Sequence, residues 1–216
     1  MNKLKVFVDE KGRFGNPVGV VEDIYGVIES GKRQAMAKDS GLSEIVFIDN
    51  VENQIISIYS PTRQIPFAGH AAVGTAYYLR SKLNNPIKQL VSMGEVIKVW
   101  EESNQTWVKT ATEKLPKWNM LHIETVEELE AIDNRQAIQN HAFLWTWMDE
   151  NKGLVRARTL APDWGITEDE ANGSGSMLLS VKLGKELIIH HGKGSVIYAR
   201  PNKTGIGEVG GRVVYE

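Results

Sequence analysis

Alternating apolar and polar residues recur in short runs along the chain, and this pattern predicts β-strands. In the first half the predicted strands are residues 4–10, the end of 12–23, 43–49, 55–61, 96–103 and 106–116. In the second half they are residues 141–150, 153–162, 186–194, 195–201 and 208–216. Because the runs come in hairpin-like pairs and do not alternate steadily with helices, they favour an α+β sheet or barrel over a doubly wound fold.

Fewer segments have the spacing or composition of helices. After Pro66, small and apolar residues at helical spacing predict a helix over residues 69–83 that is buried against a sheet. A shorter helix is expected at residues 30–42, with Ser30 as its N-cap and Gly41 as its C-terminal stop. Further short helices are predicted at residues 126–132 and 177–186, and residues 161–176 are expected to form a turn-rich loop.

One arrangement occurs twice, about 100 residues apart. In the first half, Ser60–Pro61 leads through a short loop to Ala68–Gly69–His70–Ala71 and then to a helix. In the second half, Ala161–Pro162 leads through a loop to Asn172–Gly173–Ser174–Gly175 and then to a helix. A duplicated lobe is the simplest explanation, although junctions of this kind are common in unrelated proteins.

The repeat predicts two similar lobes. Pro116 marks the expected boundary, which gives an N-terminal lobe of residues 1–115 and a C-terminal lobe of residues 116–216.

The composition excludes several classes of function. Because 25 Lys and Arg stand against 27 Asp and Glu, the net charge of -2 offers no basic field for nucleic acid or an anionic membrane. The chain has no cysteine, which removes disulfides, thiolate metal sites and thiol nucleophiles. No apolar run approaches the ~18 residues of a membrane span, and the first residues lack the apolar core of a signal peptide, so we expect a soluble cytoplasmic protein.

The two glycine-started helices are candidate anion sites. A helix start presents free backbone N–H groups and the positive end of the helix dipole, and glycine lets a ligand approach the backbone closely. Two such starts that face each other, at Gly69 and Gly173, would hold the carboxylate of a small substrate and stabilise charge that develops in a reaction. For a single helix, capping by solvent or by side chains is the commoner arrangement.

Glu44, His70 and Asp169 are the acid/base candidates. Glu44 opens an apolar strand after a helix, where partial burial raises the pKa of a carboxyl group toward a value useful for proton transfer. His70 lies at a helix start and Asp169 in a loop before Gly173. Each also has an ordinary interpretation: a surface glutamate, a structural histidine and an Asx turn or N-cap.

We find no convincing metal-ligand spacing. His190 and His191 are adjacent, so on a strand they point to opposite faces and cannot bind one ion together. No other set of histidines and carboxylates has the spacing of a metal site, so no metal is expected.

Four motifs follow one another in order along the chain: F-G-N-P at Phe14–Pro17, S-E-x-V-F at Ser43–Phe47, P-F-x-G-H-A at Pro66–Ala71, and A-P-x-x-G-I-x-E-D-x-x-x-G-S at Ala161–Ser174. Together they resemble the PhzF-like family, which includes the phenazine-biosynthesis isomerases. The resemblance runs nearly end to end and implies the fold of diaminopimelate epimerase: two similar lobes, each a mostly antiparallel sheet rolled around a central helix, with the site between them. Those epimerases use two cysteines, and this chain has none. A two-cysteine mechanism is therefore excluded here.

The resemblance also implies roles for particular residues. Glu44 matches the proton-shuttling glutamate of the family, while His70 and Asp169 match residues that hold and polarise the substrate. Backbone groups at the two helix starts complete the implied substrate site: Gly69, Ala71, Gly173, Ser174 and Gly175. The implied activity is that of an isomerase without metal or organic cofactor, acting on a small carboxylate-bearing substrate, and family members often form homodimers.

The sequence departs from the family pattern around these residues. Ile45 stands where threonine is usual, Gln64 where a glutamate is common, and Glu170 and Asn172 replace the usual proline and threonine. These departures affect substrate identity more than reaction type. They leave two other functions open: a binding protein that keeps the cleft without turnover, and a structural protein whose lobes serve an interface.

Overall fold

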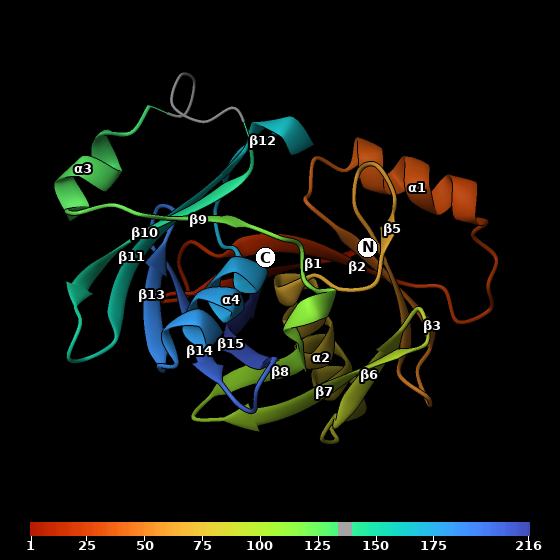
Figure 1. The fold of residues 1–216 in the computed structure, drawn as a ribbon. Helices are drawn as coiled ribbons and strands as arrows, with labels where there is room; N and C mark the ends of the chain where they lie inside the picture. Colours follow the sequence, from red (N-terminus) through yellow and green to blue (C-terminus); the bar gives the residue numbers. More distant parts are fainter. Residues whose placement is uncertain (134–139) are drawn as a thin grey trace.

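Strands dominate the protein and join into one large, mostly antiparallel sheet, so the predicted α+β class is confirmed (Figure 1). The computed structural model describes residues 1–133 and 140–216.

The first-half strands, together with β15, close into a ring. Its members, in hydrogen-bonded order, are β1 (Asn2–Val8), β2 (Asn16–Glu22), β3 (Ile45–Asn50), β4 (Ile55–Tyr59), β6 (Gln89–Ser92), β7 (Glu95–Glu102), β8 (Gln105–Ala111) and β15 (Ile206–Tyr215). Closure comes from β15, which pairs with β8 on one side and with β1 on the other. The helix α2 (Gly69–Leu83) lies inside the ring and contacts strands on several sides.

A second set of strands continues from β15. In order they are β14 (Ser195–Pro201), β13 (Leu187–His191), β11 (Leu154–Ala161), β10 (Ala142–Asp149) and β9 (Asn119–His122). The helix α4 (Gly173–Leu183) packs on β14 and β15, and α3 (Val126–Ala131) packs on β10 and β11. Figure 1 shows α2 and α4 side by side at the centre of the molecule.

The pairing pattern of the first half recurs in the second. In β2-α1-β3-β4-α2-β6-β7, with α1 at Ser30–Asp39, each helix joins two parallel strands and the remaining neighbours are antiparallel. In β9-α3-β10-β11-α4-β13-β14 the parallel and antiparallel pairings recur in the same order. Even the short strands β5 (Gln64–Ile65) and β12 (Ile166–Asp169) correspond, because each pairs with the strand before the second helix. This repeat supports duplication, while the lobe boundary at Pro116 stays a prediction.

Local sequence explains most elements and the few differences. The helix α2 has the predicted bounds, and it is buried on most sides because its inner residues are small. The first short helix begins at Ser30 and not after it, so Glu29 is the N-cap and its side chain makes no cap bond. Residues 161–176, expected as a loop, contain the 3-10 turn η2 (Pro162–Trp164), β12 and the start of α4. A second 3-10 turn, η1 (Thr112–Lys114), follows β8.

Arg33 fastens α1 to the sheet. Its guanidinium forms ion pairs with Asp23, at 2.7 Å, and with Asp49, at 2.6 Å. The same group lies over the ring of Phe47, 4.8 Å from the centroid. Glu44 lies between the end of α1 and the start of β3, so this cluster also fixes the segment that carries Glu44.

Replacing Arg33 is expected to destabilise the fold. Arg33→Met leaves two carboxylates without their cation, and breaking such a buried pair costs about 3 kcal/mol or more of unfolding free energy. Urea denaturation of the purified protein measures this loss. Lys32→Met, at an exposed position in the same helix, is the control and should change stability by less than about 0.5 kcal/mol. Equal stability of the two variants would contradict the role of Arg33.

Candidate active site

Glu44 and His70 are in direct contact. Glu44 directly precedes β3, and His70 is the second residue of α2. Glu44 Oε2 lies 2.8 Å from His70 Nε2, with 15% and 7% of the two side chains exposed. The two atoms form an ion pair when the imidazole is protonated, and among the described residues neither has another hydrogen-bond partner. The buried carboxylate can still accept further hydrogen bonds from a ligand.

Asp169 reaches the same place from the second half of the chain. It is the last residue of β12 and opposes Thr159 of β11. Its charge acts on the pKa of His70, and the charges of Glu44 and His70 act on its own pKa. The three acid/base candidates therefore form one electrostatically coupled group.

This coupling shifts the pKa values of two of the three groups. Burial raises the pKa of Asp169 to about 6, and the neighbouring Glu44 charge adds to this, while His70 and two hydrogen bonds oppose it. Burial alone would lower the pKa of His70, but the contact with Glu44 and the charge of Asp169 raise it overall. The raised pKa favours a protonated imidazole beside Glu44.

Asn16 holds Asp169 in position. Asn16 is buried, and its Nδ2 donates to Asp169 Oδ1, at 2.7 Å, and to the Ala171 carbonyl, at 3.0 Å. Asn16 belongs to the F-G-N-P motif, which the sequence analysis used for the resemblance without giving this residue a role. The motif thus links the first ring to the strand that carries Asp169.

Substitution of Asn16 is expected to raise the pKa of Asp169. Its hydrogen bond lowers the pKa of Asp169, so Asn16→Ala is expected to move that pKa above about 6. Titration of the Asp169 carboxyl carbon by ¹³C NMR measures the shift. Asn53→Ala, at an exposed position, serves as the control. An unchanged or lower midpoint in Asn16→Ala would contradict the assignment.

Further hydrogen bonds support the backbone beside Asp169. His191 is fully buried, with Nδ1 3.0 Å from the Glu170 carbonyl and Nε2 2.9 Å from Thr159 Oγ1. Burial lowers the pKa of His191 to about 4, so this ring is neutral at pH 7 and Nδ1 can donate to the carbonyl. Ser195 Oγ donates to the Glu170 carboxylate at 2.7 Å.

The two helix starts meet, as the sequence predicted. A Cβ atom added at Gly69 would lie 3.1 Å from Gly173 Cα, and one added at Gly173 would lie 3.3 Å from Gly69 Cα. Any side chain at either position would crowd the other helix, so glycine is required for this approach. The N-cap of α2 is Ala68, which has no side-chain acceptor for the first amides of the helix. The positive ends of two helix dipoles therefore lie together beside His70.

Side chains at the start of α4 form a hydrogen-bonded chain that the sequence analysis did not foresee. Asn172 Oδ1 accepts from Gly175 N, at 2.8 Å, and from Ser174 Oγ, at 3.0 Å. Ser174 Oγ in turn accepts from the indole N–H of Trp118, at 2.9 Å. Asn172 Nδ2 is buried and has no hydrogen-bond partner among the described residues. It is an unpaired polar atom near the helix starts.

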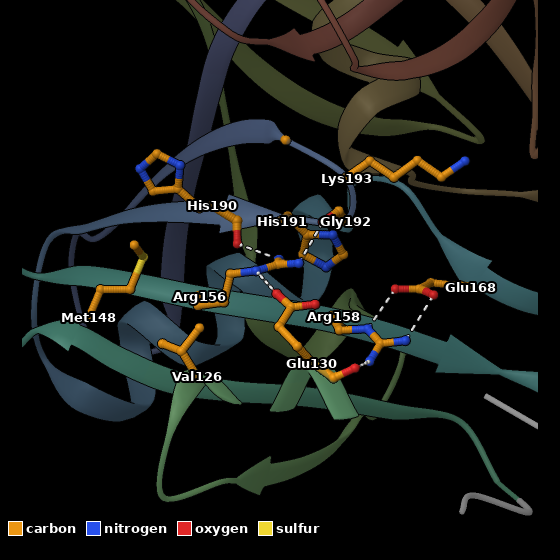
Figure 2. Close-up of a pocket in the computed structure, with 11 residues that line it drawn as sticks. Val126, Glu130, Met148, Arg156, Arg158, Glu168, His190, His191, Gly192 and Lys193 are labelled. Carbon is orange, nitrogen blue, oxygen red and sulfur yellow. Dashed lines mark hydrogen bonds and ion pairs between the residues drawn. The ribbon is translucent and has the colours of Figure 1, made fainter. Parts of the chain in front are cut away.

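A separate open cavity of about 670 Å³ lies elsewhere, and none of Glu44, His70 and Asp169 lines it (Figure 2). Its arginines are occupied: Arg156 pairs with Glu130 and Arg158 with Glu168. Figure 2 shows that the arginine and glutamate side chains of each pair point toward one another. The site beside His70 is the better candidate because its titratable groups are buried and coupled to one another, with no arginine neutralising them among the partners described above.

Within residues 1–133 and 140–216, no group of three or more histidine, aspartate or glutamate side chains is placed to hold a metal ion. In the same part of the chain, none of the helices combines the length and apolar character that crossing a bilayer requires.

The family model described as phenazine biosynthesis-like protein, PhzC-PhzF, matches residues 4–144. The trans-2,3-dihydro-3-hydroxyanthranilate isomerase of Pseudomonas chlororaphis is 26% identical over 217 aligned residues, which cover 83% of this chain and 78% of that protein.

Solved structures share the fold. A phenazine biosynthesis PhzC/PhzF protein from Clostridium difficile superposes with a TM-score of 0.78 at 17% identity, covering 100% of this chain and 96% of the other. A hydroxyproline epimerase from Agrobacterium vitis superposes with a TM-score of 0.58 at 11% identity, covering 100% and 90%. The expected epimerase-like architecture is therefore confirmed at the level of the fold.

Proposed function

Because this chain belongs to the PhzC/PhzF family of phenazine biosynthesis-like proteins and is an isomerase, we propose that it moves a proton between two carbons of a small carboxylate-bearing substrate. The observation that carries the proposal is the buried contact between Glu44 and His70, coupled to the charge of Asp169. It supplies a base, an acid and a hydrogen-bonding group at one place.

In the proposed reaction, the Glu44 carboxylate accepts a proton from a substrate carbon. The electron pair of the broken C–H bond stays on the substrate and shifts through its unsaturated system, so a double bond moves. The protonated Glu44 then returns the proton to a different carbon. No atom is gained or lost, and the product is an isomer of the substrate.

The surrounding groups lower the energy of the charged intermediate. The first amides of α2, which have no side-chain cap, bind the substrate carboxylate. Those amides of α4 that the Asn172 side chain does not cap contribute to the same site, because both helix dipoles present their positive ends there. The raised pKa of His70 favours its protonated form, which stabilises negative charge that develops on the substrate. Asp169, held by Asn16, binds a polar substituent on the other side of the substrate.

We propose a cyclic amino carboxylate as the substrate. The matched Pseudomonas relatives are named for trans-2,3-dihydro-3-hydroxyanthranilate, an unsaturated ring that bears a carboxylate and an amino group. The replacements at Glu170 and Asn172 lie beside Asp169 and the start of α4, so we expect differences in the ring substituents that this chain accepts.

Incubation with trans-2,3-dihydro-3-hydroxyanthranilate and related ring carboxylates in D₂O tests the proposal. Proton NMR should show one carbon-bound hydrogen exchanged and the double bond moved, without added metal or cofactor. Binding of these compounds with neither exchange nor isomerisation would contradict the proposal and favour a binding protein of the same fold.

A further inference from the structure

Three aromatic rings pack together beside the candidate site. The rings of His141 and Trp164 are stacked, with centroids 4.1 Å apart and an interplanar angle of 25°. Trp118 packs edgewise against both, with centroids 4.9 Å from Trp164 and 5.6 Å from His141. We call these three residues the aromatic wall.

Polar contacts hold the aromatic wall in place. His141 Nδ1 lies 2.7 Å from Asp163 Oδ2, and Nε2 lies 2.8 Å from the Lys117 carbonyl. The indole N–H of Trp118 is bonded to Ser174. Because hydrogen bonds fix the rings of His141 and Trp118, the aromatic wall is preorganised and does not need to become ordered when a ligand binds.

The wall touches both second-half elements that carry site residues. Trp118 contacts Ser174, which directly follows Gly173 in α4. Trp164 ends η2, which leads into β12 and so to Asp169. Trp164 remains 42% exposed, which leaves aromatic surface uncovered at this position.

We infer that the aromatic wall selects substrates whose carboxylate is carried by a flat, unsaturated ring. This inference rests on the proposed function, because it takes the helix starts as the carboxylate site. A carboxylate bound at the start of α4 lies beside Trp118, because the Trp118 indole donates to Ser174 Oγ, and Trp118 in turn packs against Trp164. A planar ring can stack on the wall there, whereas a puckered ring of equal carbon count makes poorer contact.

Ligand binding to wall variants tests the inference, with benzoate and cyclohexanecarboxylate as probes. Both probes carry one carboxylate on a six-membered carbon ring, and they differ in planarity. Calorimetric titration of the wild-type protein should show tighter binding of benzoate. Trp164→Ala should weaken benzoate about three- to tenfold, as expected from loss of one aromatic pair, and weaken cyclohexanecarboxylate less. Trp164→Phe should keep most of the benzoate affinity.

Trp100→Ala is the matched control. Trp100 lies on β7 and stacks on Trp107, with centroids 6.0 Å apart, so the variant removes an indole that belongs to a different aromatic pair. It should bind both probes like the wild type. Circular dichroism and melting temperature establish that each variant is folded.

Several outcomes would overturn the inference. They are equal losses for the two probes in Trp164→Ala, no loss in that variant, or no preference for benzoate in the wild type, including binding of neither probe. The proposed function fails separately, through absent proton exchange into ring substrates. A benzoate preference that depends on Trp164 in a protein without exchange would retain the aromatic wall and remove the isomerase mechanism.

Discussion

Glu44→Gln is expected to lower the rate of proton exchange between substrate carbon and solvent by about 10²–10⁴-fold, the usual contribution of a positioned acid/base group. Glutamine has nearly the shape of glutamate but cannot take up a proton and return it at neutral pH. The fold should persist, because the glutamine side chain occupies the same space beside His70 and its amide oxygen can accept a hydrogen bond there. Deuterium incorporation into the substrate, followed by NMR at saturating substrate, measures the effect.

Two further variants sharpen this test. Glu44→Asp keeps a carboxylate but moves it away from His70, so it should retain more activity than Glu44→Gln. Glu52→Gln removes an exposed carboxylate and should leave the rate unchanged. If Glu44→Gln exchanges deuterium at the wild-type rate, Glu44 is not the base.

Gly69→Ala is expected to reduce turnover about 100-fold while costing little stability. Its methyl group would lie 3.1 Å from Gly173 Cα and 3.6 Å from Ser174 N, so the two helix starts must separate. Misplacing the groups that bind and orient the substrate by about 1 Å costs about 10²-fold in rate. A small separation of the two helix starts is therefore enough to reduce turnover. Steady-state kinetics and thermal unfolding together separate this effect from loss of fold.

Gly31→Ala is the control for this change. Gly31 is the second residue of α1, as His70 is of α2, and a Cβ atom there meets nothing within 4 Å. This variant should keep full activity and gain slightly in stability, because alanine is the better helix former. Wild-type turnover in Gly69→Ala would mean that the close approach of the helices is not required.

Local patterns in the sequence predicted the elements that have strong local signals. The helix at residues 69–83 has its bounds because small apolar residues repeat at helical spacing after Pro66. The short strands β5, β6, β9 and β12 were missed, since runs of two to four residues carry no measurable periodicity. Their positions are set by neighbouring strands and not by their own sequence.

The sequence pointed to the three acid/base candidates but not to the hydrogen bonds that hold the surrounding residues in place. Glu44, His70 and Asp169 came from the motif order, and the structure places them in one coupled group. The bond from Asn16 to Asp169 spans 153 positions, so no local pattern contains it. The same is true of Trp118 and Ser174, which are 56 positions apart. Only the unexplained asparagine in F-G-N-P gave a signal that could have been followed.

The placement of β15 has a consequence for how the protein forms during synthesis. The ring around α2 is built from strands made early, yet its closing strand pairs Val6 with Val213 and follows the other strands of the described residues. While the nascent chain lacks β15, the facing edges of β1 and β8 have no partner, and open edges of this kind invite pairing with other chains. Closing the ring also requires a contact between distant segments, which slows folding. Early strands therefore depend on the last one for protection, and the period before β15 emerges is when this protein is most exposed to aggregation.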